Sequence, residues 1–442
     1  MSTKEENNIS ESSITKIVLD NNVRLIHCKI PTSSFVTIEI SVLAGSRNES
    51  DDEMGIAHFL EHTMFSGTDK RPNNKVIGFE IESLGGSMNA FTSEETTAYY
   101  IKIPYENFTK AFEILSDMFL HSNFNSSYLE IEKGVVKEEL RMYEDTPQRD
   151  IFTLYNELLY KGTPLGRDIG GTVSSIDNIT RAKVINFIKN NYYLNNIVIS
   201  IVGNIETSKA IDTVIKYFKN DNLKARALVN GENKYIKSRF SEDSIKVKKK
   251  DVNQTHFILG LRGYPAGDNR QYSLNVLSAI IGGGFGAWLF QKLRNEMGVA
   301  YYVYSGTQEY MDIGDLHIVA GVDNQRFEES LVTIIKTISS IKNKNIKKED
   351  IVRAKEYIKG SISSYFETTD NMASFFADEE LKFGKIRSLD EMKSSIDKVS
   401  LDSLYDVFED ITRQDIKKHI YLACILPEKT STSNLDSIIN NA

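Results

Sequence analysis

The chain has 442 residues, of which 40% are hydrophobic and 26% are charged. This length allows two to four domains, and the composition is that of a globular protein, which excludes a mainly disordered chain. The formal net charge of −8 provides no basic footprint, so we expect no nucleic-acid partner and no membrane-surface partner. Cys28 and Cys424 are almost a chain length apart and are expected to be free thiols.

The beginning of the chain is polar. Its first residues, MSTKEENNISESSIT, contain acids and resemble neither a secretory signal nor a transit peptide. No apolar run in the sequence reaches the length of about 18 residues that a membrane-spanning helix requires. We therefore expect a soluble, cytoplasmic protein.

Hydrophobic periodicity predicts mixed helix and strand in the first half. Residues 36–42 alternate between apolar and polar, which is typical of a half-buried strand. Residues 55–65 are predicted to form a helix that Gly67 stops, and 89–102, rich in Thr and Tyr, to form strands. The prediction continues with helices at 105–119 and 127–142 and a buried strand at 197–202.

A similar order of elements recurs in the second half of the chain. The similar segments 99–108 and 316–327, each ending in Phe, precede amphipathic helices, and strands at 197–202 and 420–425 close the two halves. These repeats predict an α+β fold of two duplicated domains, each a mainly antiparallel sheet packed by helices. The alternative is two unrelated α+β domains. The predicted limits are 1–225 for the first domain, 226–250 for a linker and 251–442 for the second domain.

The motif with the clearest chemistry is His58-Phe-Leu-Glu61-His62. Residues i and i+4 share a face of a helix, so both imidazoles can point at one metal ion with Glu61 beside them. The H-x-x-E-H order is the inversion of the more common zinc-protease helix. The alternative is a pair of structural surface histidines next to a surface acid.

A catalytic zinc ion usually has three protein ligands and one open position. The candidates for a third ligand lie in the segment 132–139. Glu132 and Glu139 are seven residues apart, so they share one stripe of a helix, but Glu138 lies on an equally regular stripe. Periodicity alone does not choose between Glu138 and Glu139.

Several ordered motifs together resemble a known family, the inverzincin zinc metallopeptidases of the pitrilysin and insulysin type. The resemblance is closest to the shorter, mitochondrial-processing-peptidase-like subgroup, which includes bacterial enzymes, and it covers most of the chain. The motifs that carry it lie at 45–50, 55–65, 85–92, 132–147 and 289–301.

The resemblance implies a complete zinc site. By the family pattern, one Zn²⁺ per chain is bound by His58, His62 and Glu139, and Glu132 supports these ligands without binding the metal. Glu61 activates the zinc-bound water. The implied activity is zinc-dependent endopeptidase cleavage of unfolded peptides or presequence-like segments.

The resemblance also implies substrate-binding residues. Arg294 and Tyr301 correspond to a pair that assists binding and transition-state stabilisation, although the adjacent Tyr302 leaves the tyrosine register open. The substrate-binding edge strand corresponds to Asn89, Ala90, Phe91 and Thr92.

The zinc motif and the Arg/Tyr pair are both present in this chain, and the second half carries no second zinc motif. Long relatives in the family that the chain resembles carry the zinc motif in the first of four such domains and the Arg/Tyr pair in the last. The resemblance therefore implies a clamshell homodimer in which Arg294 and Tyr301 of the partner subunit complete each zinc site. A heterodimer with a related chain is the alternative assembly. The alternative function is a catalytically silent partner or scaffold subunit of a processing-peptidase-like complex.

Overall fold

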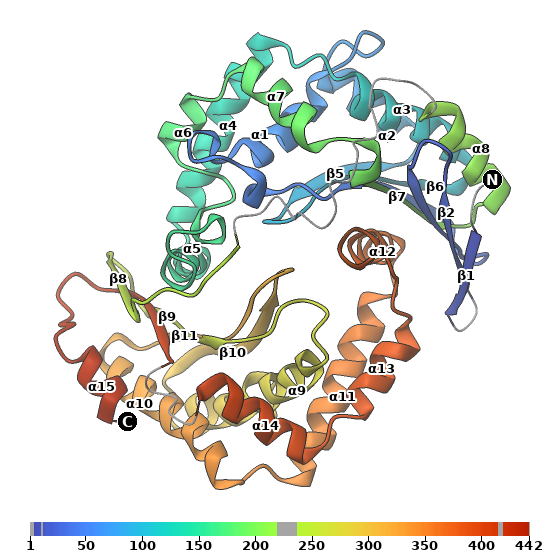
Figure 1. The fold of residues 1–442 in the computed structure, drawn as a ribbon. Coiled ribbons are helices and arrows are strands. Elements are labelled where there is room, and N and C mark those ends of the chain that lie inside the picture. The colour runs from blue at the N-terminus through green and yellow to red at the C-terminus, as the bar shows by residue number, and fades with distance from the viewer. Residues whose placement is uncertain (1–3, 10–11, 219–236, 414–418, 442) are drawn as a thin grey trace. The chain divides into compact units, whose positions relative to one another are not determined.

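The computed structural model describes residues 4–9, 12–218, 237–413 and 419–441 (Figure 1). The chain divides into two compact units, each of which contains a sheet packed by helices. The first unit consists of Met1–Leu140, Asp168–Ile236 and Ser364–Asp390, and the second of Arg141–Arg167, Lys237–Ser363 and Glu391–Ala442. The predicted α+β class is therefore confirmed.

The sheet of the first unit has the strand order β1-β2-β3-β7-β4-β6-β5. Its neighbouring strands are antiparallel except β3 and β7, which run parallel, so the predicted mainly antiparallel sheet is confirmed. Among the described strands, β5 has a neighbour on one side alone. The strands are β1 (Lys4–Ile9), β2 (Ser12–Val18), β3 (Arg24–Lys29), β4 (Phe35–Val42), β5 (Ser87–Thr92), β6 (Thr97–Pro104) and β7 (Ile197–Gly203).

One face of this sheet is apolar and carries the main core of the unit. Ile38 and Ile40 of β4 and Ile101 of β6 are completely buried against α1 and α3. Removal of such side chains from water is the principal stabilising contribution to the unit. The helices of this unit are α1 (Ile56–Thr63), α2 (Asn74–Ser83), α3 (Phe108–His121), α4 (Ser126–Glu144, which extends past the unit's boundary), α6 (Val173–Asp177), α7 (Arg181–Asn191), α8 (Thr207–Tyr217) and α12 (Thr369–Phe383).

The opposite face of the sheet departs from the prediction. Residues 36–42 form a strand as predicted, but the strand is not half-buried, because its polar residues are buried as well. Thr37, Glu39 and Ser41 are 0%, 1% and 3% exposed. The reason is α12, which packs across β4 and β7 (Figure 1). An alternating pattern predicts which residues share a face, but it does not reveal a cover that comes from more than 320 residues later in the chain.

The sheet of the second unit has the order β10-β11-β9-β12-β8, in which the β12–β8 pair is parallel and the other pairs are antiparallel. Helix α9 packs on β10, and α5 packs on β9 and β12. The strands are β8 (Ile245–Lys249), β9 (Thr255–Arg262), β10 (Ala300–Glu309), β11 (Gly314–Val322) and β12 (Tyr421–Leu426). The helices are α5 (Pro147–Leu159), α9 (Arg270–Gly282), α10 (Phe327–Ser339), α11 (Lys348–Tyr365), α13 (Leu389–Asp397), α14 (Leu401–Thr412) and α15 (Leu435–Asn441).

The compact units do not coincide with the two halves of the sequence. Helix α5 comes from the first half but belongs to the second unit, and α12 comes from the second half but belongs to the first. The division into 1–225 and 251–442 therefore stays a prediction about the sequence repeat. The predicted linker, 226–250, begins with residues outside the described ranges. Its end differs from the prediction, since β8 pairs with β12 there.

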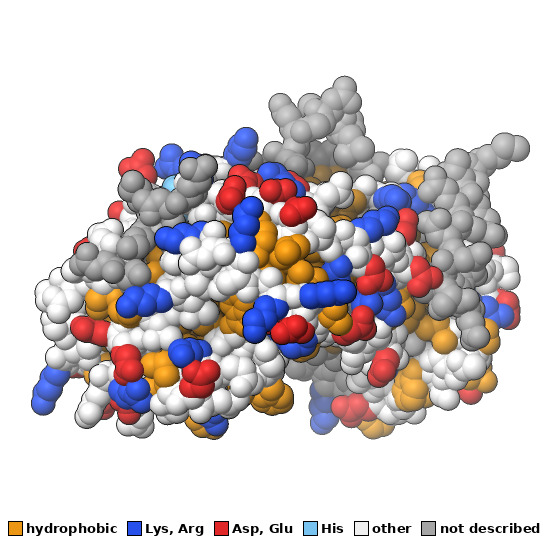
Figure 2. Space-filling view, turned by 90° about the horizontal axis from the view of Figure 1, so that it is seen from below, with side chains coloured by type: hydrophobic (Ala, Val, Ile, Leu, Met, Phe, Trp, Pro, Cys, Tyr) orange, Lys and Arg blue, Asp and Glu red, His pale blue; other side chains and the backbone are white. Residues whose placement is uncertain are grey.

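Basic and acidic side chains are interspersed on the face of the molecule that Figure 2 presents, with hydrophobic side chains between them. Charge on that face is therefore mixed rather than of one sign. Over the ranges that the structure describes, no helix combines the length and the apolar character needed to cross a membrane.

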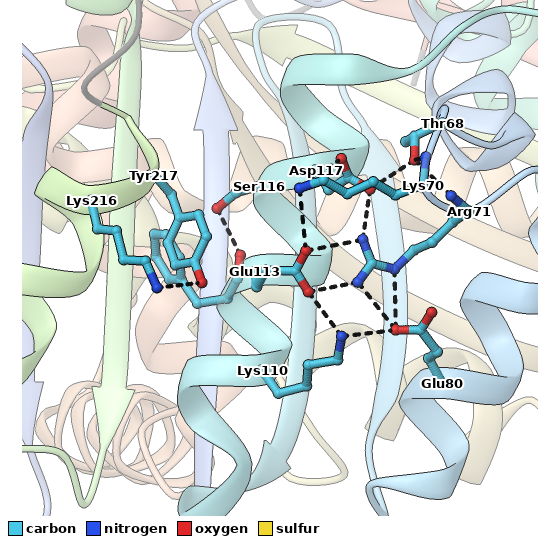
Figure 3. A network of polar contacts seen from close by, with 11 residues as sticks. Thr68, Lys70, Arg71, Glu80, Lys110, Glu113, Ser116, Asp117, Lys216 and Tyr217 are labelled. Carbon is cyan, nitrogen blue, oxygen red and sulfur yellow. Dashed lines mark hydrogen bonds and ion pairs between the residues drawn. The ribbon is translucent and has the colours of Figure 1, made fainter.

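A buried arginine connects the loop before α2 to two helices of the first unit (Figure 3). The Arg71 guanidinium binds Asp117 and Glu113 of α3, each at 2.6 Å, and Glu80 of α2 at 3.1 Å. Burial opposes ionisation of Glu113, but hydrogen bonds from Arg71 and Lys110 outweigh it and lower the pKa of Glu113 to about 2. This network fixes the position of α2 relative to α3.

Arg71→Ala is expected to lower the free energy of unfolding by about 3–5 kcal/mol, because it removes the closest cation from the buried carboxylate of Asp117, which then has Lys70 at 4.0 Å as its nearest ion-pair partner among the described residues. The measurement is the urea and thermal midpoint of the full chain. Lys70→Ala is the matched control, since this neighbouring lysine is 65% exposed and its loss should cost less than about 1 kcal/mol. Similar small shifts in both variants would show that the network is not a stabilising element.

Candidate metal centre

Helix α1 begins at a buried carboxylate. The two oxygens of Glu49 accept hydrogen bonds from the backbone N–H groups of Gly55 and Ala57, both at 2.9 Å, which satisfies donors that an uncapped helix would leave unpaired. Gly55 has a φ of +86°, and a Cβ there would lie 2.5 Å from the Gly170 carbonyl oxygen. This position therefore requires glycine, and the start of the helix is fixed.

The sequence of α1 decides which side chains face outward from the core. Ile56, Phe59 and Leu60 are completely buried in the apolar core. The helical repeat then places His58 and His62 together on the other face, where their ring centroids are 4.7 Å apart. The predicted helix and the predicted pairing of these histidines match the structure.

Helix α4 brings an acid to the two imidazoles. One carboxylate oxygen of Glu139 lies 3.6 Å from Nε2 of His58 and 3.3 Å from Nε2 of His62. Ligand atoms around a tetrahedral zinc ion with bonds of about 2.0–2.1 Å are about 3.3–3.4 Å apart. The donor types and their spacing therefore fit zinc. Within the described ranges, this is the single group of three metal-ligating side chains with donor atoms within 4.8 Å of one another.

The charges around the site favour a bound cation. Burial and the nearby His62 lower the pKa of His58 to about 4, so its imidazole is neutral and keeps a lone pair for a metal. Burial also disfavours the charged form of His62, but hydrogen bonds with Glu132 and Glu139 outweigh it and raise the pKa of His62 to about 9. The carboxylates that favour a proton on this ring would equally favour a metal ion beside it.

Glu132 contacts the outer side of His62 and does not belong to the group of three donor residues. Its carboxylate lies 3.3 Å from Nδ1 of His62, the ring nitrogen that does not face Glu139, so it can orient the imidazole and set its tautomer. The Tyr128 hydroxyl hydrogen-bonds to Glu132 and lies 3.4 Å from Asn74 of α2. Sequence reasoning missed Tyr128, although its i, i+4 spacing to Glu132 was a usable signal. Glu138, the competing candidate, is exposed.

The predicted base and the predicted substrate strand meet at the site. The Thr92 hydroxyl at the end of β5 donates a 2.7 Å hydrogen bond to Glu61. Burial raises the pKa of Glu61, and the bond from Thr92 opposes this effect. A cavity of about 370 Å³ is lined by Glu61 and His62 together with Asn89 and Ala90 of the strand. The contact between Thr92 and Glu61 depends on tertiary structure, so no sequence pattern indicated it.

The structure brings Arg294 and Tyr301 together in the second unit. Arg294, on the π-helix Phe290–Glu296, donates a 3.0 Å hydrogen bond to the Tyr301 carbonyl, and its guanidinium carbon lies 5.5 Å from the centroid of the Tyr301 ring. Tyr301 is 68% exposed. Tyr302 instead hydrogen-bonds His256 at 2.7 Å. The exposed side chain of the two is therefore Tyr301, the residue that the resemblance to the family favours.

Comparison with known proteins gives two family matches in chain order. Residues 24–173 match the insulinase domain of peptidase family M16. Residues 178–358 match the domain described as the peptidase M16 inactive domain. Together these matches cover most of the chain, and the first includes the whole metal cluster described above.

Relatives that match along most of this chain are named zinc proteases. A Bacillus subtilis protein named uncharacterized zinc protease YmxG is 33% identical over 94% of this chain and 98% of its own. An uncharacterized zinc protease of Rickettsia felis is 29% identical over 93% of this chain and 98% of its own. A crystal structure described as a protease from Helicobacter pylori aligns with a TM-score of 0.85 and 22% identity, covering 97% of this chain and 100% of that one. The last comparison establishes the fold.

Glu139→Gln is expected to abolish zinc binding, because it replaces the anionic donor of the cluster with a neutral amide, whereas Glu138→Gln should keep about one zinc per chain. Metal content after dialysis and the rise of the melting temperature on addition of zinc are the measurements. The two variants remove the same charge from neighbouring positions of α4. Equal zinc content in both would remove Glu139 as a ligand.

Proposed function

Because the chain belongs to the insulinase family, peptidase family M16, we propose that it is a zinc-dependent endopeptidase acting on unfolded peptides or presequence-like segments. The observation that carries this proposal is the combination of a metal-ligating cluster with a carboxylate that does not ligate and is hydrogen-bonded to an edge strand. Zinc proteases among the relatives support the metal and the general activity.

His58, His62 and Glu139 would hold the zinc ion, and Glu132 would orient His62 from behind. Bound zinc would supply Lewis-acid chemistry, by polarising a carbonyl and lowering the pKa of water toward neutrality. A set of two neutral imidazoles and one carboxylate leaves one unit of positive charge on a divalent ion, which preserves this acidity.

Glu61 performs the proton transfers. It lies on α1 one residue before His62 and three after His58, outside the donor cluster. It accepts a proton from the water that attacks the peptide carbonyl and delivers that proton to the leaving amine. The hydrogen bond from Thr92 holds one of its oxygens, so the proton-accepting oxygen has a defined position.

The edge strand β5 accounts for a preference for unfolded substrates. Since β5 is paired on one side alone among the described strands, an extended peptide can add to its other edge through main-chain hydrogen bonds. A folded protein offers no free strand for this addition. Thr92 connects the strand to Glu61, which sets the register between the bound peptide and the base.

The assembly that we favour is a homodimer that closes as a clamshell. Arg294 and Tyr301 are already paired in the second unit, and Tyr301 is exposed, as expected of side chains that act on a bound peptide. In the homodimer, Arg294 and Tyr301 of the partner subunit complete each zinc site. A heterodimer with a related chain is the alternative that the mixing experiment below addresses.

Glu61→Gln should reduce kcat for an unfolded peptide by about 10²–10⁴-fold, the usual contribution of a general base, while zinc content stays unchanged. A quenched fluorescent peptide pool and metal analysis provide the two readouts. Glu82→Gln, a substitution near the end of α2, is the control. If zinc is bound but no unfolded peptide is cleaved by the wild type, the chain is a silent partner or scaffold.

Cross-subunit completion is tested by co-expressing a Glu61→Gln chain with an Arg294→Ala chain. In a mixed dimer, one site combines an intact Glu61 with an intact Arg294 of the partner subunit. Random pairing should therefore restore about a quarter of the wild-type activity. Activity no greater than the mean of the two separate variants would place both residues in the same subunit's site.

A further inference from the structure

A second pocket of the first unit lies on the sheet face opposite the metal cluster. It has a volume of about 300 Å³ and is bounded by β4, by the end of β5 and by α12. Phe91, Tyr365 and Phe375 form aromatic walls, and Glu39 and Asp378 contribute carboxylates. We refer to it as the α12 pocket. The zinc chemistry does not use any of these side chains.

Glu39 is a buried acid whose partners, among the residues that the structure describes, are hydroxyls rather than cations. One of its oxygens accepts a 2.6 Å hydrogen bond from Ser41 and the other a 2.5 Å bond from Ser374. No lysine or arginine in the described part of the chain forms an ion pair with it, and burial raises the pKa of Glu39 to about 7. Two hydroxyls offset part of its desolvation, but a cation would stabilise it far more.

The other charges of the pocket leave an acidic excess. Asp378 on α12 pairs with Lys382 at 3.1 Å, but Lys382 also contacts Glu95 at 3.4 Å. Glu95 also pairs with Arg47 at 2.6 Å, so two cations face the three carboxylates of Asp378, Glu95 and Glu39. Asp378 is 43% exposed at its side chain and Glu39 1%. The two acceptors therefore lie at different depths, which suits a long side chain rather than a compact ion.

The pocket is on the face to which a bound peptide would direct every second side chain. Phe91 lines the pocket, whereas Thr92, the next residue of β5, bonds Glu61 on the metal side. A strand added to β5 follows the same alternation, so side chains on the Phe91 face point toward the pocket while their neighbours point toward the metal side.

We propose that the α12 pocket receives a lysine or arginine side chain of the peptide substrate, whose charged end hydrogen-bonds to Asp378 and Glu39. The aromatic walls contact its apolar stem, and the cationic group balances the acidic excess. This inference rests on the proposed peptidase function and adds a side-chain preference to it.

The test uses matched fluorogenic peptides that carry one arginine at successive positions around the cleaved bond, each paired with a peptide that carries citrulline, a neutral isostere. At one position on the Phe91 face, kcat/KM should be at least about tenfold higher for arginine, as expected of charge-assisted hydrogen bonds. Glu39→Gln and Asp378→Asn should each reduce that ratio severalfold.

Asp370→Asn is the matched control. Asp370 lies on α12 as well but pairs with Lys102 at 2.7 Å and is not among the residues that line the pocket, so its variant should keep a ratio close to the wild-type value. Asp378 is partly exposed, and its variant carries the test if Glu39→Gln impairs folding.

Equal rates for arginine and citrulline peptides at every position, or a preference that both pocket variants retain, would overturn the inference and leave the peptidase function intact. Absence of cleavage of every peptide would instead overturn the peptidase function, and this inference with it.

Discussion

The carboxylate of Glu49 at the start of α1 is the interaction on which the candidate active site depends. An eight-residue helix is too short to be stable on its own, so α1 exists because its first N–H groups are capped and its apolar side chains are buried. These two constraints fix the rotation of the helix about its axis. His58 and His62 therefore point to a defined place, which Glu139 reaches from a separate element, α4.

A series of supporting contacts surrounds the cluster of His58, His62 and Glu139. Glu132 orients His62 and is hydrogen-bonded by Tyr128, which lies beside Asn74 of α2. Helix α2 is in turn attached to α3 through Arg71. The buried arginine network contains none of the three residues of the cluster, but it fixes the position of α2, which contacts their supporting residues through Asn74.

The sequence was sufficient for features that depend on local periodicity and insufficient for those that depend on rotation or tertiary contact. The i, i+4 spacing predicted the histidine pair, because a helix repeats within one turn. It did not decide between Glu138 and Glu139. The burial of Val136 turns Glu132 and Glu139 toward α1 and leaves Glu138 exposed, and a single sequence does not reveal which stripe of α4 is buried.

The polar face of β4 shows that a helix from a distant part of the sequence can bury residues that an alternating pattern places in contact with water. Alternation indicated a face in contact with water, yet α12 covers Thr37 and Glu39 and supplies hydroxyls from Thr369 and Ser374 to match them. Such a face is stable under a helix only where the helix brings matching polar groups. The α12 pocket lies where this cover meets the end of β5 and where Glu39, within the described ranges, has hydroxyl partners but no cation. The alternating pattern placed Glu39 on a face in contact with water, but the cover buries its carboxylate. That carboxylate can therefore accept hydrogen bonds from a substrate side chain that carries a positive charge.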